Sequence, residues 1–140
     1  MALRVDWEGL IVGFESRSRL ITHFFDRETG DVEQVLEKDA DRHAAMSRDL
    51  RYLALPRDEG ERSRGDLEEF LGHCEDPECR RALEGALAAA DSAPRYRETL
   101  LRFPKEEARF FQFKEHQALE RAQRWLASVG VAFTKPPREM

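Results

Sequence analysis

The stretch LITHFFDRETGDVEQVL, residues 20–36, decides the fold of this chain. Side chains alternate between two faces with a period of two along its first third, which is the pattern of a β-strand. A second β-branched run resumes after the charged residues 26–31. Gly30 can adopt the positive φ that closes a turn, and the oxygens of Asp26 and Thr29 can bond the turn backbone. The stretch therefore predicts an antiparallel β-hairpin.

The segments around the hairpin predict helices and one more strand. Asp6 is a suitable N-cap for a short helix, and residues 37–50 have the composition of a surface helix. Residues 52–55 precede Pro56, which favours an extended conformation, so they predict a third strand. The glycines and dense charge of residues 57–65 predict a loop.

The second half of the chain predicts helices throughout. Asp76 and Pro77 supply an N-cap and a first helical residue, Pro94 opens another helix, and Pro104 begins the longest one. Together the elements predict an α+β fold, with a small antiparallel sheet (the hairpin and the third strand) covered by four to five helices. Residues 1–133 are expected to form a single domain, and residues 134–140 a flexible C-terminal tail.

The last helix carries the longest apolar stripe of the chain. At about 100° per residue, five of its side chains fall close to one line along the helix. They are Phe111, Ala118, Ala122, Trp125 and Val129. We take this line as the main core face, so alanine at Phe111 or at Trp125 is expected to cost about 3–5 kcal/mol of stability.

Composition predicts a soluble, cytoplasmic chain. Of the 140 residues 41% are hydrophobic and 36% charged, and the mean hydropathy is −0.68. These values are too apolar for a disordered segment and too polar for a membrane protein. No run approaches the ~20 apolar residues of a spanning helix, and the start lacks the apolar region of a signal peptide. The two cysteines, Cys74 and Cys79, are expected to be free thiols.

Charge is unevenly distributed, and the last helix combines cations with aromatic rings. The net charge of −5 divides into −9 over residues 1–93 and +4 over residues 94–140. On the helical wheel, one stripe beside the core face forms a candidate binding surface of aromatic and basic side chains: Phe110, Phe113, Lys114, Arg121 and Arg124. Such a stripe suits single-stranded nucleic acid. The alternative is that the rings widen the buried face and the arginines cover its rim.

Other reactive residues form no specific motif. Cys74 and Cys79, with His73, would need a further ligand such as His43 or His116 to bind zinc, and packing between helices explains both cysteines. His23 and Asp26 are three residues apart on a strand, so their side chains are expected on opposite faces. No acidic run fits a calcium loop. We therefore expect scattered reactive side chains, and predict no catalytic, cofactor-binding or metal-binding residue.

A series of short motifs resembles a known protein family. In order they are Phe14-Glu15, Phe24-Phe25-Asp26-x-x-Thr29-Gly30-x-Val32, Tyr52 to Pro56, Phe70, Tyr96-Arg97, Phe110-Phe111-x-Phe113 and Ala122-x-x-Trp125. Over Asp6 to Val129 the chain resembles uncharacterised protein family 0158 of the bacterial UPF series. The resemblance implies a small sheet followed by helices in a bacterial cytoplasmic protein. It brings no catalytic residue, and Cys74 and Cys79 depart from the family pattern.

The function expected from these observations is binding rather than catalysis. The first hypothesis is a non-enzymatic interaction module of unknown biological role, which binds a protein partner or itself through the hairpin edge or the last helix. The second is association with nucleic acid through the aromatic and basic stripe. The third is an unassigned hydrolase or transferase that uses His23, Asp26 or His116. No cofactor is expected, and no membrane.

Overall fold

The computed structural model describes residues 2–16, 18–56 and 61–136. The chain forms two compact units, one made of Met1–Asp58 with Ala118–Met140 and the other of Glu59–Gln117. Within the described residues, six helices and a three-stranded antiparallel sheet confirm the α+β class. The single domain expected over residues 1–133 stays a prediction, because compact units within a chain need not be separate domains.

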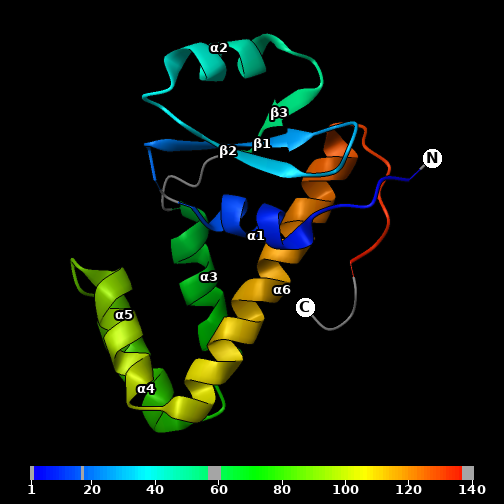
Figure 1. Ribbon diagram of the computed structural model, residues 1–140. Helices are drawn as coiled ribbons and strands as arrows, with labels where there is room; N and C mark the ends of the chain where they lie inside the picture. Colours follow the sequence, from blue (N-terminus) through cyan, green and yellow to red (C-terminus); the bar gives the residue numbers. More distant parts are fainter. Residues whose placement is uncertain (1, 17, 57–60, 137–140) are drawn as a thin grey trace. The chain divides into compact units, whose positions relative to one another are not determined.

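The sheet of the first unit has the strand order β2-β1-β3, so β1 is its central strand (Figure 1). The strands are β1 (Ile21–Asp26), β2 (Val32–Leu36) and β3 (Tyr52–Ala54). Both β2 and β3 run antiparallel to β1. The predicted hairpin and the predicted third strand are therefore confirmed.

The hairpin turn uses the residues that the sequence predicted. Gly30 has a φ of +81°, and a Cβ at this position would clash with the backbone carbonyl of Arg4. Only glycine satisfies both demands without strain. The backbone N–H groups of Glu28 and Thr29 donate to Oδ1 of Asp26 at 2.9 and 3.3 Å. The turn thus depends on the Asp26 carboxylate, which accepts from two backbone N–H groups, and on Gly30, which allows the positive φ.

Different helices cover the two faces of the sheet (Figure 1). Phe24 lies on one face, under α2 (Ala40–Arg48), and packs there with Met46. Phe25 lies on the other face, where α1 (Trp7–Glu15) and the last turns of α6 complete a larger core. The buried residues of that core are Val5, Trp7, Leu10, Phe14, Phe25, Leu55, Ala122, Leu126 and Val131.

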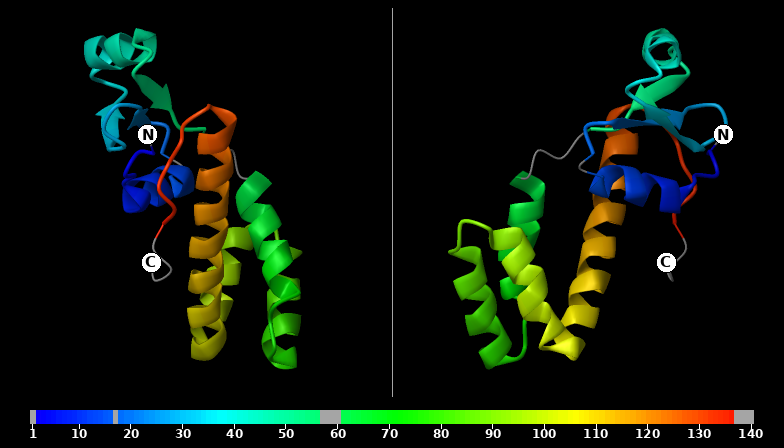
Figure 2. Two further views of the ribbon diagram at one scale, coloured as in Figure 1. Left: turned by 90° about the vertical axis from the view of Figure 1, so that its right-hand side faces the viewer. Right: turned by 60° about the vertical axis from the view of Figure 1, so that its left-hand side comes forward.

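The second unit consists of helices. They are α3 (Glu61–Leu71), α4 (Pro77–Leu87), α5 (Ser92–Leu101) and the first turns of α6 (Pro104–Ser128). Helices α4 and α5 lie side by side (Figures 1 and 2). The buried core of this unit comprises Leu67, Phe70, Cys74, Cys79, Leu83, Ala86, Leu87, Tyr96, Leu100 and Phe110.

Two predicted N-caps are confirmed. Oδ1 of Asp6 accepts a hydrogen bond from the N–H of Gly9 at 3.0 Å, where α1 begins. Oδ1 of Asp76 accepts from the N–H of Glu78 at 2.9 Å, and Pro77 is the first residue of α4. Each cap satisfies backbone donors that have no partner inside the helix.

The loop predicted for residues 57–65 is wrong over residues 61–65, which begin α3. Residues 57–60 lie outside the described part of the chain. Gly65 contributed to the loop prediction, but it lies within α3. A Cβ at this position would have no atom within 4 Å, so no close contact requires a glycine there. An exposed glycine costs a helix about 1 kcal/mol, which tertiary packing of the same helix can outweigh.

The core face of α6 differs from the predicted one. Phe111, the reference point of the predicted stripe, is 59% exposed, whereas its neighbour Phe110 is 3% exposed. The buried residues of α6 follow steps of four, or of twice four: Glu106, Phe110, Ala118, Ala122 and Leu126. Each step of four turns the buried line by about 40° around the helix. A single straight stripe does not describe these residues, because the first turns of α6 pack into one core and its last turns into another.

The segments at the two ends of the described chain run alongside each other (Figure 2). Leu3 and Phe133 form an isolated parallel bridge, and the N–H of Thr134 donates to the carbonyl of Leu3 at 2.8 Å. Thr134, the first residue of the predicted tail, is therefore hydrogen-bonded. Of the predicted tail, residues 137–140 lie outside the described part. None of the described helices is long and apolar enough to cross a bilayer.

Candidate functional site

The aromatic side chains of the predicted binding surface lie largely inside the second unit. Phe110 is 3% exposed and packs against the rings of Phe70 and Tyr96, with centroid distances of 5.2 and 5.6 Å. Phe113 is half-buried and contacts the rings of Phe70 and His73 at 5.6 and 5.3 Å. Base stacking needs an open aromatic face. The buried ring of Phe110 therefore cannot serve as a stacking platform.

The basic side chains of that surface are divided between the two units. Lys114 is half-buried in the second unit, with Nζ 6.0 Å from the centre of the Phe110 ring. Arg121 is half-buried and Arg124 exposed, and both belong to the first unit. The interpretation that the rings widen the buried face is correct for Phe110, whereas Arg124 is accessible.

His23 and Asp26 lie on opposite faces of β1, as the pleat requires. His23 faces α1, where a Cβ on Gly13 would lie 3.2 Å from the His23 ring. Asp26 is on the other face and binds Arg51, with Nε to Oδ1 at 2.9 Å and Nη2 to Oδ2 at 2.8 Å. The two side chains therefore lie on opposite faces as expected and do not form a hydrogen-bonded acid–base pair, and Asp26 has a structural role.

The ion pair of Asp26 and Arg51 was not foreseen from the sequence. Arg51 lies 25 positions further along the chain and also contacts Glu28 at 3.3 Å. The guanidinium holds the pKa of Asp26 well below its usual value, and the turn N–H groups act in the same direction. The carboxylate raises the pKa of Arg51 in return. A bidentate pair of this kind fixes the start of β3 against the hairpin turn.

We expect Asp26→Asn to lower the free energy of unfolding by roughly 1.5–3 kcal/mol at neutral pH, because hydrogen bonds to a charged group are lost. The lowered pKa means that this stabilisation is complete above the unfolded-state pKa of about 3.9. It is lost as the pH falls through the lower folded-state pKa. Urea unfolding near pH 7 and near pH 3 measures the free energy of unfolding of wild type and of Asp26→Asn at each pH. The difference in free energy between the two proteins should be smaller at the lower pH.

Asp31→Asn is the matched control, because Asp31 belongs to the same turn but its side chain is exposed. This variant should remain within about 0.5 kcal/mol of wild type at neutral pH. A cost of Asp26→Asn that is the same at both pH values would show that shape, and not charge, is what Asp26 supplies.

Three reactive side chains meet inside the second unit, which corrects the expectation that such groups are scattered. The thiols of Cys74 and Cys79 and the carboxylate of Glu106 place one donor atom each within 4.8 Å of one another. Their exposures are 8%, 0% and 5%. Cys74 follows α3, Cys79 is in the first turn of α4, and Glu106 is in the first turn of α6. We call these three residues the thiol–carboxylate cluster.

Hydrogen bonds orient the carboxylate of the cluster. Oε1 of Glu106 accepts from Nη1 of Arg109 at 3.0 Å, and Oε2 accepts from the backbone N–H of Glu75 at 3.3 Å. Burial raises the pKa of Cys74 to about 12, and the nearby Glu106 carboxylate adds to the rise. Burial also raises the pKa of Cys79. Burial thus favours the protonated thiols, which are weak nucleophiles.

A cavity of about 580 Å³ adjoins the cluster. Glu106 lines this cavity and also belongs to the cluster, so the two share a carboxylate. The rest of its lining is charged or apolar: Glu75, Asp76, Arg102, Phe103, Pro104 and Lys105. The sequence singled out both cysteines but not Glu106, because only the fold brings a residue 27 positions beyond Cys79 to the same place.

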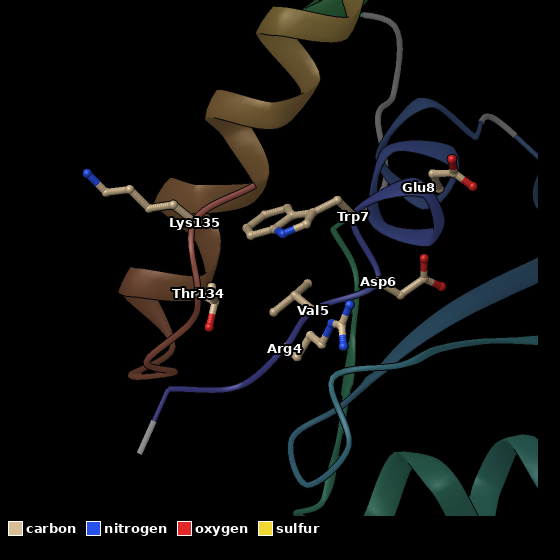
Figure 3. Close-up of a pocket in the computed structure, with 7 residues that line it drawn as sticks. All are labelled: Arg4, Val5, Asp6, Trp7, Glu8, Thr134 and Lys135. Carbon is tan, nitrogen blue, oxygen red and sulfur yellow. The ribbon is translucent and has the colours of Figure 1, made fainter. Parts of the chain in front are cut away.

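A second cavity, of about 370 Å³, lies in the first unit between its N-terminal and C-terminal segments. Figure 3 shows the Trp7 indole pointing towards the segment of Thr134 and Lys135, and the carboxylates of Asp6 and Glu8 pointing away from that segment. The carboxylate of Asp6 already caps α1. The described lining shows no pair of groups arranged for catalysis, so we assign this cavity no chemistry.

Strand β2 has β1 beside it on one side only, within the described residues. The N–H of Asp26 donates to the carbonyl of Asp31, and that of Glu37 to the carbonyl of Leu20, both at 2.8 Å. In an antiparallel ladder such bonds recur at every second residue, so the odd-numbered residues of β2 bond β1. The even-numbered residues direct their backbone groups to the free edge: Val32, Gln34 and Leu36. The carbonyl of Leu36 also accepts from the N–H of Asp39 at 3.0 Å.

Two arrangements therefore stand out as candidate sites. One is the free edge of β2, defined by Val32, Gln34 and Leu36, and the other is the thiol–carboxylate cluster. Comparison of the chain with protein-family models, curated proteins and solved structures finds no match. The resemblance to family 0158 accordingly stays a prediction, and the two sites rest on their own geometry.

Proposed function

We propose that this chain is a non-enzymatic interaction module that pairs with a second copy of itself through the free edge of β2. The observation that carries the proposal is the row of outward N–H groups of Val32, Gln34 and Leu36, together with the outward carbonyls of Val32 and Gln34. An edge of this kind accepts a further strand, whose main-chain hydrogen bonds supply affinity. Since Leu36 is 44% exposed, pairing would also cover apolar surface.

The free edge is self-complementary in one antiparallel register. When Gln34 of one copy stands opposite Gln34 of the other, Val32 stands opposite Leu36. These outward residues then form hydrogen-bonded pairs across a two-fold axis, which is the usual symmetry of a homodimer. An apolar pair and a neutral polar pair meet there, so the register is favourable.

The neighbouring registers are unfavourable. Centring the pair on Glu33 would place two Glu33 carboxylates opposite each other, and centring it on Val35 would place Glu33 opposite Glu37. Like charges directly opposite destabilise a sheet. In the favoured register Asp31 stands opposite Glu37 just beyond the strand. Added salt is therefore expected to strengthen the pairing, because it screens this repulsion.

Charge substitutions at Gln34 test the proposal directly, because each copy meets its own substitution at the axis. We expect Gln34→Glu and Gln34→Lys each to weaken the dimer by about 1 kcal/mol or more, or roughly fivefold in Kd. An equimolar mixture of the two variants should restore the dimer, since opposite charges now meet. Sedimentation equilibrium over a concentration series measures all three Kd values.

The matched control is Leu50→Lys, at a residue that is 85% exposed and lies outside β2. This variant should dimerise as the wild type does. A wild type that stays monomeric at every concentration would contradict the proposal. A dimer that is equally stable in both Gln34 variants and in their mixture would contradict it as well, because the contact would then lie elsewhere.

A further inference from the structure

The thiol–carboxylate cluster has the donor atoms of a metal site. Two sulfur atoms and one carboxylate oxygen lie within 4.8 Å of one another, and all three residues are at least nine-tenths buried. Donor atoms around one tetrahedral zinc stand roughly 3.5–4 Å apart, given bonds of about 2.0–2.3 Å. Small side-chain rotations are therefore enough to bring these atoms to coordinating positions.

We infer that Cys74, Cys79 and Glu106 bind a thiophilic divalent cation, with Zn²⁺ as the first choice. Binding displaces the proton of each thiol into solvent, and the resulting thiolates select zinc over magnesium and calcium, which prefer oxygen. Carboxylate is a regular third ligand for zinc. This site lies wholly within the second unit and does not depend on the edge of β2.

The surroundings hold the three ligands in place. Oδ1 of Asp76 accepts from the backbone N–H of Cys79 at 3.4 Å, which fixes the turn between the two cysteines. Arg109 donates one hydrogen bond to Glu106 and another, at 2.8 Å, to the carbonyl of His73. Partners that orient ligands in this way are typical of metal sites and affect affinity strongly.

The adjoining cavity of about 580 Å³ supplies the remaining requirement, a path for the ion. Cys79 is fully buried, but Glu106 lines the cavity. Three protein ligands leave one tetrahedral position, which a water molecule from the cavity can take. His73, the nearest histidine in sequence, is exposed, and its ring contacts that of Phe113 in a tilted arrangement with a centroid distance of 5.3 Å, so we do not include it among the ligands.

Co²⁺ added to the full-length, metal-free and chemically reduced protein tests the inference. We expect one Co²⁺ per chain, with a thiolate-to-cobalt charge-transfer band in the near ultraviolet and the intense visible absorption of a tetrahedral site. One equivalent of Zn²⁺ should abolish both bands, because zinc binds such a site more tightly than cobalt. Absence of the charge-transfer band at saturating Co²⁺ would overturn the inference without any variant.

Substitutions then assign the ligands. Cys74→Ala and Cys79→Ala should each reduce the charge-transfer absorption strongly, and Arg109→Gln should weaken Co²⁺ binding by about 10–100-fold. His73→Ala is the matched control and should leave stoichiometry and spectrum unchanged. Far-UV circular dichroism verifies that each variant is folded. A full charge-transfer band in folded Cys79→Ala, or its loss in His73→Ala, would place the metal on other residues and overturn the assignment.

Discussion

Phe110→Ala is expected to lower the free energy of unfolding by about 3–5 kcal/mol, which is the usual cost of removing a buried phenylalanine ring. Phe110 is 3% exposed and contacts the rings of Phe70 and Tyr96. Its loss would leave a cavity beside the buried hydroxyl of Tyr96, which donates to the carbonyl of Leu67 at 3.0 Å. Urea denaturation followed by circular dichroism measures the change.

The adjacent residue provides the control for that prediction. Phe111 is 59% exposed, so Phe111→Ala should stay within about 0.5 kcal/mol of wild type. Both variants remove the same atoms from the same helix, so helix propensity affects them alike. Equal costs at the two positions, or a larger cost at Phe111, would show that the buried face of α6 is wrongly assigned here.

Trp125→Ala is expected to cost about 3 kcal/mol, at the lower end of the range for large aromatic residues because Trp125 is only half-buried. Its indole contacts the rings of Phe14 and Phe25 edge-on, with centroid distances of 5.9 and 6.0 Å. It therefore joins α1 and β1 to the last turns of α6. Unfolding by urea, followed by circular dichroism, gives the free-energy difference.

Arg124→Ala is the control for this second prediction, because Arg124 is the exposed neighbour on the same helix. The expected change is within about 0.5 kcal/mol. If Trp125→Ala unfolds at the same urea concentration as wild type, then the core between α1, β1 and α6 does not depend on the indole.

The hairpin shows what local sequence patterns can predict. Its alternation, its turn residues and its glycine all act within the 17 residues from Leu20 to Leu36. The capping residues Asp6 and Asp76 are local signals as well, and both were confirmed. Such interactions join neighbours in the chain, so no knowledge of the tertiary fold is needed to foresee them.

The buried face of α6 shows where a periodic pattern fails. A single wheel assumes that one helix packs against one core, whereas α6 contributes Phe110 to one core and Leu126 to another. A single wheel combines the buried positions of both ends of α6, and this places Phe111 on the predicted core face although it is 59% exposed. Only the course of the whole chain shows which of two adjacent phenylalanines is buried.

Contacts between distant segments were not predictable either. Arg51 reaches Asp26 from 25 residues away, and Glu106 reaches Cys74 from 32 residues away. Most arginines and glutamates are exposed, so an arginine before a strand or a glutamate in the first turn of a helix is expected at the surface, without a buried partner. What distinguishes these two pairs is burial, which follows from the fold.

Backbone amide exchange in β2, measured at low and at high protein concentration, shows whether the free edge pairs with a second copy of the chain. The amides of Glu33 and Val35 should be protected at both concentrations, because they bond β1. Those of Val32, Gln34 and Leu36 should become protected only at high concentration, when a second copy bonds them. Unchanged exchange of these three amides in a sample that has dimerised would contradict this pairing.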